Sequence, residues 1–156
     1  MKKRTKIFLI TLSSIVVLVF VFAKAKRISP LSWGHKEVNQ PMFSNQAING
    51  YDPVAYFTHN EAVLGNETYT YDWNNAKWNF SSEENKQLFT ENPEKYAPQF
   101  GGYCAFAISK GFTANSSPDS FELINDKLYL FDNEDVKLSW KENLEENLRV
   151  SEENWQ

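Results

Sequence analysis

The strongest constraint on this chain is an apolar run near its N-terminus that is framed by basic residues. The run extends from Ile7 to Ala23 and is interrupted only by Thr11, Ser13 and Ser14. As a helix rising about 1.5 Å per residue it reaches roughly 25 Å, just short of a hydrocarbon core of about 30 Å. Four basic residues precede the run and three follow it, which favours export of the remainder. We therefore expect residues 1–27 to be a signal anchor, with the membrane as partner of Ile7–Ala23.

A cleaved signal peptide is the alternative interpretation of the same segment. Ala23-Lys24-Ala25 has the small-x-small spacing of a cleavage site, although a lysine within it makes the site a poor one. An uncleaved anchor is the interpretation we favour. It places the domain on the periplasmic or extracellular side of the membrane, and a cleaved leader would release it as a secreted protein.

Charge separates this leader from the rest of the chain. From Ile28 onward the sequence carries nine basic and twenty acidic side chains, a net charge of −11. A surface of that sign repels phosphate backbones, so nucleic acid is a poor partner. The acidic excess mainly keeps an exported domain soluble.

The remaining sequence predicts one small α+β domain behind a tether. Residues 28–46 are polar and aperiodic, so we expect a tether there and a domain over 47–156. No internal repeat is apparent. Strands are expected at 68–73 and 77–80, joined by Asn-rich turns, and again at 121–124 and 127–131. Helical segments are expected between these pairs and at the C-terminus.

Capping signals locate several helix starts. Asp52 before Pro53 predicts a helical turn, and Ser81 with Glu84 has the spacing of a capping box. After the pair Gly101-Gly102, an apolar run predicts a helix that begins at Tyr103 and ends at Gly111.

Four segments with characteristic residues follow one another along the chain: Gly50–Phe57, Trp73–Ser82, Phe89–Tyr96 and Tyr96–Ala105. Together they resemble the YHS domain family, in particular an exported bacterial branch of which some members are described as selenoproteins. The resemblance implies an α+β fold over about residues 47 to 155. YHS domains of copper-transporting ATPases resemble metal-binding modules with cysteines at the positions of Ala55 and Ser81, so that metal site does not carry over.

Cys104 is the only cysteine and the main candidate for chemistry. If the helix begins at Tyr103, Cys104 lies in its first turn, where free N–H groups and the helix dipole favour the thiolate. The resemblance to relatives with selenocysteine implies redox or soft-metal chemistry at this position. A buried cysteine acting as a small apolar side chain is the competing interpretation.

A metal site at Cys104 would need further ligands. His59 is the more plausible of two histidines, because His35 falls in the expected tether. A soft transition metal such as copper could use Cys104, His59 and Met42. Two chains meeting at Cys104, as a homodimer, could share an ion or a disulfide.

Residues around these motifs are the candidates for ligand binding. They are Gly101, Gly102, Tyr103, Tyr51 and Asp52. The glycines would let a ligand approach closely, while the many aromatic residues serve first to build a core. Three functions stay open: a binding module for a soft metal or small ligand near Cys104, a thiol redox protein, and a non-catalytic interaction domain.

Overall fold

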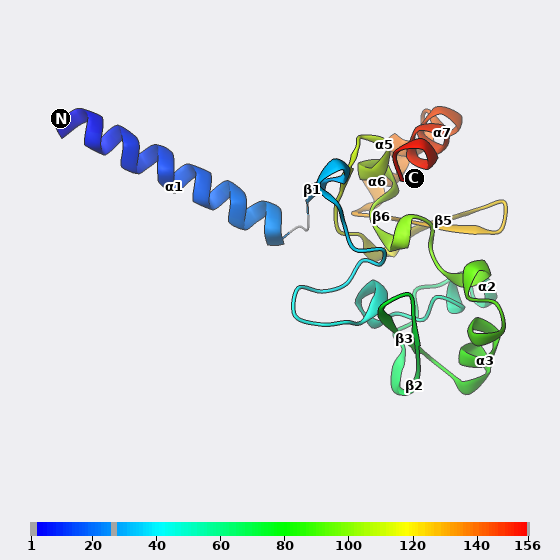
Figure 1. The fold of residues 1–156 in the computed structure, drawn as a ribbon. Coiled ribbons are helices and arrows are strands. Elements are labelled where there is room, and N and C mark those ends of the chain that lie inside the picture. The colour runs from blue at the N-terminus through cyan, green and yellow to red at the C-terminus, as the bar shows by residue number, and fades with distance from the viewer. Residues whose placement is uncertain (1–2, 26–27, 156) are drawn as a thin grey trace.

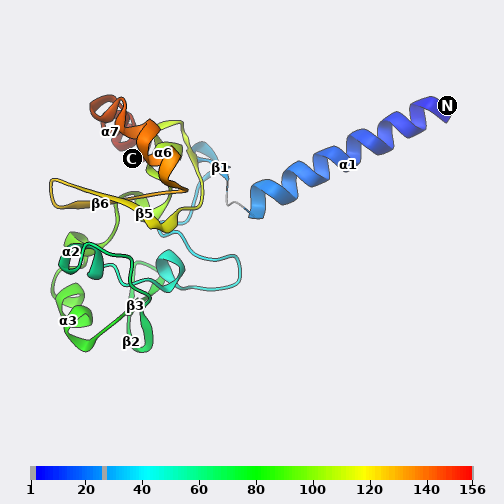
Figure 2. The ribbon, with the colours of Figure 1, turned by 180° about the vertical axis from the view of Figure 1, so that it is seen from behind.

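The computed structural model describes residues 3–25 and 28–155. Its first element, helix α1 (Lys3–Ala25), projects away from a compact domain in both views (Figures 1 and 2). Between Ile10 and Phe22 the apolar side chains of α1 are largely uncovered, with Ile10 65% and Phe22 60% exposed. Within the described part of the chain, no helix combines the length and apolar character needed to cross a membrane.

The rest of the chain mixes short helices with two-stranded sheets, which confirms the α+β class. The sheets pair β1 with β4, β2 with β3, and β5 with β6, all antiparallel. The elements are β1 (Ser29–Pro30), η1 (Leu31–Trp33), η2 (Ala47–Gly50), α2 (Ala55–Thr58), β2 (Asn66–Trp73), β3 (Ala76–Phe80), α3 (Glu83–Glu91), α4 (Pro93–Tyr96), η3 (Gln99–Gly102), α5 (Ala105–Ser109), β4 (Phe112–Thr113), β5 (Ser117–Ile124), β6 (Lys127–Phe131), α6 (Glu134–Lys141) and α7 (Leu144–Trp155).

These elements repeat in order. A first unit (residues 47–91) and a second unit (residues 99–141) each contain a tight turn, a short helix, a hairpin and a capped helix. Each tight turn holds three consecutive residues with positive φ, a conformation that is rare outside glycine. They are Ile48, Asn49 and Gly50 in η2, and Phe100, Gly101 and Gly102 in η3. In both views the β5–β6 hairpin lies above the β2–β3 hairpin (Figures 1 and 2).

The two hairpins also pair in the same register. Tyr71 faces Trp78 in the first, and Glu122 faces Tyr129 at the equivalent place in the second. Each hairpin has one irregularity, after its first pair, and each closes through two residues with positive φ, as tight hairpin turns require. The expectation that the chain has no internal repeat is therefore wrong at the level of structure. The units share backbone geometry, whereas few of their side chains agree.

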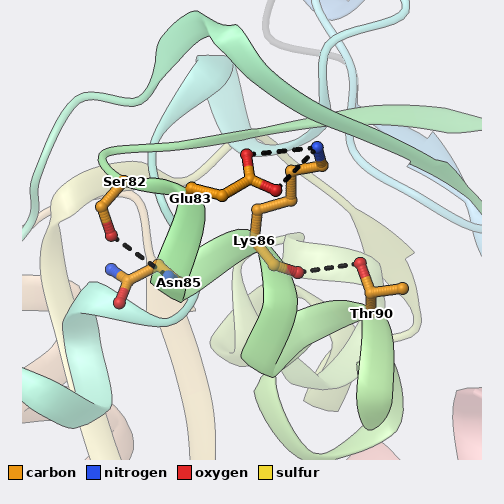
Figure 3. A network of polar contacts seen from close by, with 5 residues as sticks. All are labelled: Ser82, Glu83, Asn85, Lys86 and Thr90. Carbon is orange, nitrogen blue, oxygen red and sulfur yellow. Dashed lines mark hydrogen bonds and ion pairs between the residues drawn. The ribbon is translucent and has the colours of Figure 1, made fainter.

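Equivalent caps start the long helix of each unit. Ser82 accepts a hydrogen bond of 3.1 Å from the N–H of Asn85 at the start of α3 (Figure 3). Asn133 accepts one of 3.0 Å from the N–H of Val136 at the start of α6. The cap of α3 lies one residue after the predicted Ser81, because Ser81 is engaged elsewhere.

The buried apolar side chains form two clusters. Trp78, Phe80 and Phe89 are fully buried in the first, which also takes in Leu128 and Leu130 of β6 from the second unit. Phe131 and Trp140 are fully buried in the second, which also contains Cys104. The large aromatic side chains therefore serve mainly to fill two small cores.

The expected tether is instead part of the domain. Val38 and Asn39 are 2% and 1% exposed. Asn39 donates its backbone N–H to the Gly101 carbonyl (2.8 Å) and its side-chain amide to the Gly102 carbonyl (3.1 Å). The segment gives no periodic signal because it contributes backbone hydrogen bonds and single side chains, not an apolar face.

Candidate functional site

Cys104 lies at the boundary between η3 and α5. It is the N-cap of α5, so the helix begins at Ala105 and the predicted start at Tyr103 is wrong. The backbone N–H of Cys104 donates to the Ala114 carbonyl at 3.0 Å. A helix of five residues has little macrodipole, so the dipole argument for a reactive thiolate fails here. The side chain is buried, with 3% of the residue exposed.

Burial and backbone donors act in opposite directions on this thiol. Burial raises the pKa of Cys104 and is the largest influence. Hydrogen bonds from the backbones of Ala107, Asp132 and Phe106 lower that pKa, and the Asp132 carboxylate raises it through charge repulsion. The net pKa of Cys104 is raised, so the thiol is mainly protonated at neutral pH.

The first unit holds a carboxylate where the second holds this thiol. Asp52 and Cys104 each follow a Gly-Tyr pair at the end of the tight turn. One oxygen of Asp52 accepts from the N–H of Val54 (2.9 Å) and Ala55 (3.3 Å), and the other from the N–H of Ser81 (2.8 Å). Val54, Ala55 and Ser81 are equivalent, in the order of the two units, to Phe106, Ala107 and Asp132, whose backbones act on Cys104. The backbone of the second unit therefore forms the same arrangement that in the first unit holds an anion.

The side chains around the two positions differ in a way that matters for charge. The Ser81 hydroxyl (2.6 Å) and the Asn85 amide (2.7 Å) also donate to Asp52. In the second unit the equivalent residues are Asp132 and Val136, which offer a like charge and an apolar side chain. The thiol thus keeps the backbone donors but loses both side-chain donors, which agrees with its raised pKa.

A cavity of about 280 Å³ has Cys104 in its wall. Its wall is mainly apolar, and its charged groups are Lys110 and Asp132. The residues that form it are Phe22, Ile28, Cys104, Phe106, Ala107, Lys110, Phe112, Ala114, Asn115, Asp132 and Val136. The Lys110 ammonium lies 4.7 Å from the centre of the Phe106 ring. The cavity could admit a small molecule to the sulfur, provided that the molecule is largely apolar.

The predicted metal ligands do not come together. His59 is exposed at the end of α2, beside the first core, where its ring nitrogen is 2.8 Å from the Thr58 hydroxyl. Cys104 belongs to the second core, and Met42 does not line its cavity. Among the residues whose side chains are described, no three His, Cys, Asp or Glu groups could hold an ion. The residues present therefore do not fit the copper site that the sequence suggested.

The two glycines of η3 are approached by the chain itself. A Cβ on Gly101 would lie 1.9 Å from the Glu37 carbonyl oxygen, and one on Gly102 would lie 2.5 Å from Ile48 Cγ2. The space that we assigned to a ligand is therefore filled by the segment before η2 and by η2. Tyr103 is buried at 5% exposure.

Tyr51 and Asp52 have structural roles in the first unit. The N–H of Tyr51 closes the tight turn onto the Ile48 carbonyl at 3.3 Å. Asp52 is fully buried and is surrounded by the hydrogen bonds described above. Ala55 and Ser81, the two positions that the sequence resemblance compares with metal-binding cysteines, both donate to it, so the structure brings these two positions together.

Sequence reasoning missed Asp132, Lys110 and Val136, which surround the thiol. The sequence does contain a signal, because two short turn motifs occur twice. Gly50-Tyr51 recurs as Gly102-Tyr103, and the turn Asn74-Asn75 recurs as Asn125-Asp126. Aligning these would have placed Cys104 opposite Asp52.

Comparison with protein-family models, with curated proteins and with solved structures finds no match for this chain. The likeness to YHS domains thus rests on the sequence segments named above. The function must be argued from the geometry of the site.

Proposed function

We propose that the chain is a YHS-type domain in which Cys104 is a reactive thiol that exchanges with small disulfides. One observation carries this proposal: Cys104 follows the tight turn of the second unit as the buried carboxylate Asp52 follows that of the first, and it lines a cavity. Backbone hydrogen bonds from Phe106, Ala107 and Asp132, at positions equivalent to the donors of Asp52, lower the pKa of the thiol. Backbone N–H donors stabilise the charged thiolate more than the neutral thiol. The thiolate is the form of cysteine that attacks a disulfide. Metal binding is the weaker candidate, because no second soft ligand lines the cavity.

The reaction is a thiol–disulfide exchange. Cys104 loses its proton to water, and the sulfur anion attacks one sulfur of a low-molecular-mass disulfide. A bond forms between these two sulfurs while the original sulfur–sulfur bond breaks. The second sulfur leaves as a thiolate and takes up a proton from water. The product is a mixed disulfide at Cys104, and no further oxidant is needed.

The cavity adds selectivity to this chemistry. Phe106 and Phe112 present apolar surface beside the sulfur, while Lys110 can pair with a carboxylate on the incoming molecule. The raised pKa keeps the resting thiol neutral, which protects it from indiscriminate oxidation. Reaction then depends on occupancy of the cavity.

Mass spectrometry of the intact protein tests the proposal. We expect the folded chain, incubated with 3,3′-dithiodipropionate, a small disulfide with one carboxylate on each apolar arm, to gain one adduct on Cys104, and Cys104→Ser to gain none. The rate should approach a plateau as disulfide concentration rises, because the cavity saturates. A protein that forms the adduct only after denaturant is added would show that Cys104 is core and would end the proposal.

We further propose that α1 anchors the domain on the outer side of a membrane. The supporting observation is the uncovered apolar surface between Ile10 and Phe22, which packs on little of the domain. A single unshielded helix of this kind is poorly compatible with water. A reporter that is active only in the cytoplasm, fused after Gln156, should be silent; an active fusion would reverse the orientation.

A further inference from the structure

A larger cavity, separate from the thiol, lies between the N-terminal segment, the first hairpin, η3 and the end of α7. Its volume is about 800 Å³, within the range of small-molecule sites. The residues that form it are Leu31, Gly34, His35, Glu37, Val38, Trp73, Asn74, Trp78, Ala97, Pro98, Gln99, Phe100, Gly101, Glu152 and Trp155. None of these residues lines the cavity beside Cys104.

Aromatic rings form much of this wall. Trp73 and Trp155 both line the cavity and are only half-buried. Trp78 is held behind Trp73 by a hydrogen bond of 3.0 Å from its Nε1 to the Trp73 carbonyl. Trp155 packs on His35, with ring centres 4.3 Å apart, and on Phe100 at 5.9 Å. The rings are therefore positioned by the fold before any ligand arrives.

The charge at the cavity is negative. Glu37 and Glu152 are its carboxylates, both exposed, and none of the residues lining it is Lys or Arg. Glu152 forms an ion pair with Lys127, whose ammonium is 3.9 Å away, a long and solvent-exposed pair. Such a pair contributes little and leaves the carboxylate available. The net charge of −11 beyond residue 27 adds a field of the same sign.

We propose that this cavity binds an organic cation, an ammonium group carrying small alkyl substituents. Indole faces attract such cations through their negative quadrupole, and alkyl groups fill apolar surface that a bare ion would leave empty. The two carboxylates draw the cation in and disfavour anionic ligands. This function is independent of the thiol chemistry at Cys104.

Choline and its uncharged isostere dimethylbutanol, in which carbon replaces the ammonium nitrogen, form the matched pair of probes. Titration of the full chain, followed by NMR of the indole N–H signals, gives both affinities. We expect choline to bind about fivefold more tightly or better. Equal affinities for the two probes would overturn the proposal, as would shifts confined to signals outside the cavity.

Variants separate the contribution of charge to binding from the contribution of the cavity's shape. Glu37→Gln with Glu152→Gln should weaken choline several-fold and leave dimethylbutanol unchanged, because shape is kept and charge removed. Glu142→Gln with Glu145→Gln removes the same charge at exposed positions outside the cavity and should change neither affinity. Trp155→Leu should also weaken choline selectively. Unchanged choline affinity in the first double variant, with normal thermal melting, would show that the cavity does not recognise charge.

Discussion

Cys104 stands in the second unit where Asp52 stands in the first, and the backbone groups that donate to Asp52 have equivalents that lower the pKa of the Cys104 thiol. The pairs of donors are Val54 and Phe106, Ala55 and Ala107, and Ser81 and Asp132. Asp52 accepts two further hydrogen bonds, from the side chains of Ser81 and Asn85. Cys104 has Asp132 and Val136 at the equivalent positions, so it lacks these two side-chain donors.

Replacing Asp132 with serine, the residue at the equivalent position 81, should make Cys104 more reactive. The Asp132 carboxylate raises the pKa of the thiol, so its removal lowers that pKa. We expect the alkylation rate at neutral pH to rise several-fold, measured as a function of pH. Asp135→Ser, in the exposed first turn of α6, is the control and should leave the rate unchanged. A slower reaction in Asp132→Ser would contradict the proposed balance of charges.

The thiol should also make stability depend on alkaline pH. Because burial raises the pKa of Cys104, the folded protein keeps this proton to a higher pH than the unfolded chain does. The contribution to stability is complete below the unfolded-state pKa and is lost as the pH rises through the folded-state pKa. Urea unfolding should therefore show a shallower alkaline decline for Cys104→Ser. Burial likewise raises the pKa of Tyr129, which adds a later decline common to both proteins.

Gly101→Ala should be strongly destabilising. The new Cβ would lie 1.9 Å from the Glu37 carbonyl oxygen, and the residue has a φ of +59°. We expect a loss of about 3 kcal/mol or more in the free energy of unfolding. Gly111→Ala is the matched control, because its φ is +82° but nothing lies within 4 Å of the added Cβ. It should cost only about 1 kcal/mol, and equal losses would show that contact with Glu37 is unimportant.

Truncation should reveal that the domain begins well before residue 41. A fragment of residues 28–156 keeps the β1–β4 pairing and the hydrogen bonds of Asn39 to η3, whereas residues 41–156 lose both. We expect the longer fragment to melt cooperatively and the shorter one to melt at a clearly lower temperature. Identical melting curves would restore residues 28–40 to the role of a tether.

Sequence patterns located the elements that depend on local chemistry. The Asn-rich turns predicted both hairpins, and the Asp52-Pro53 pair predicted the capped turn before α2. Sequence patterns did not predict the features that depend on contacts between segments far apart in the chain. The left-handed φ of Ile48, which a β-branched residue rarely adopts, is imposed by its surroundings and has no sequence signal. The burial of Cys104 and the approach of Glu37 to Gly101 likewise depend on segments far apart in the chain.

The pairing of β1 with β4 has a consequence for how the protein is made. Ser29 accepts a hydrogen bond from Thr113, 84 residues further along the chain. A ribosome or an export channel delivers the earlier residue first, so this stretch must wait, without its partner, until most of the later sequence has emerged. During that interval Val38 is without its buried environment, which is the condition under which chaperones engage nascent chains. Completion of the domain is thus tied to arrival of its second half.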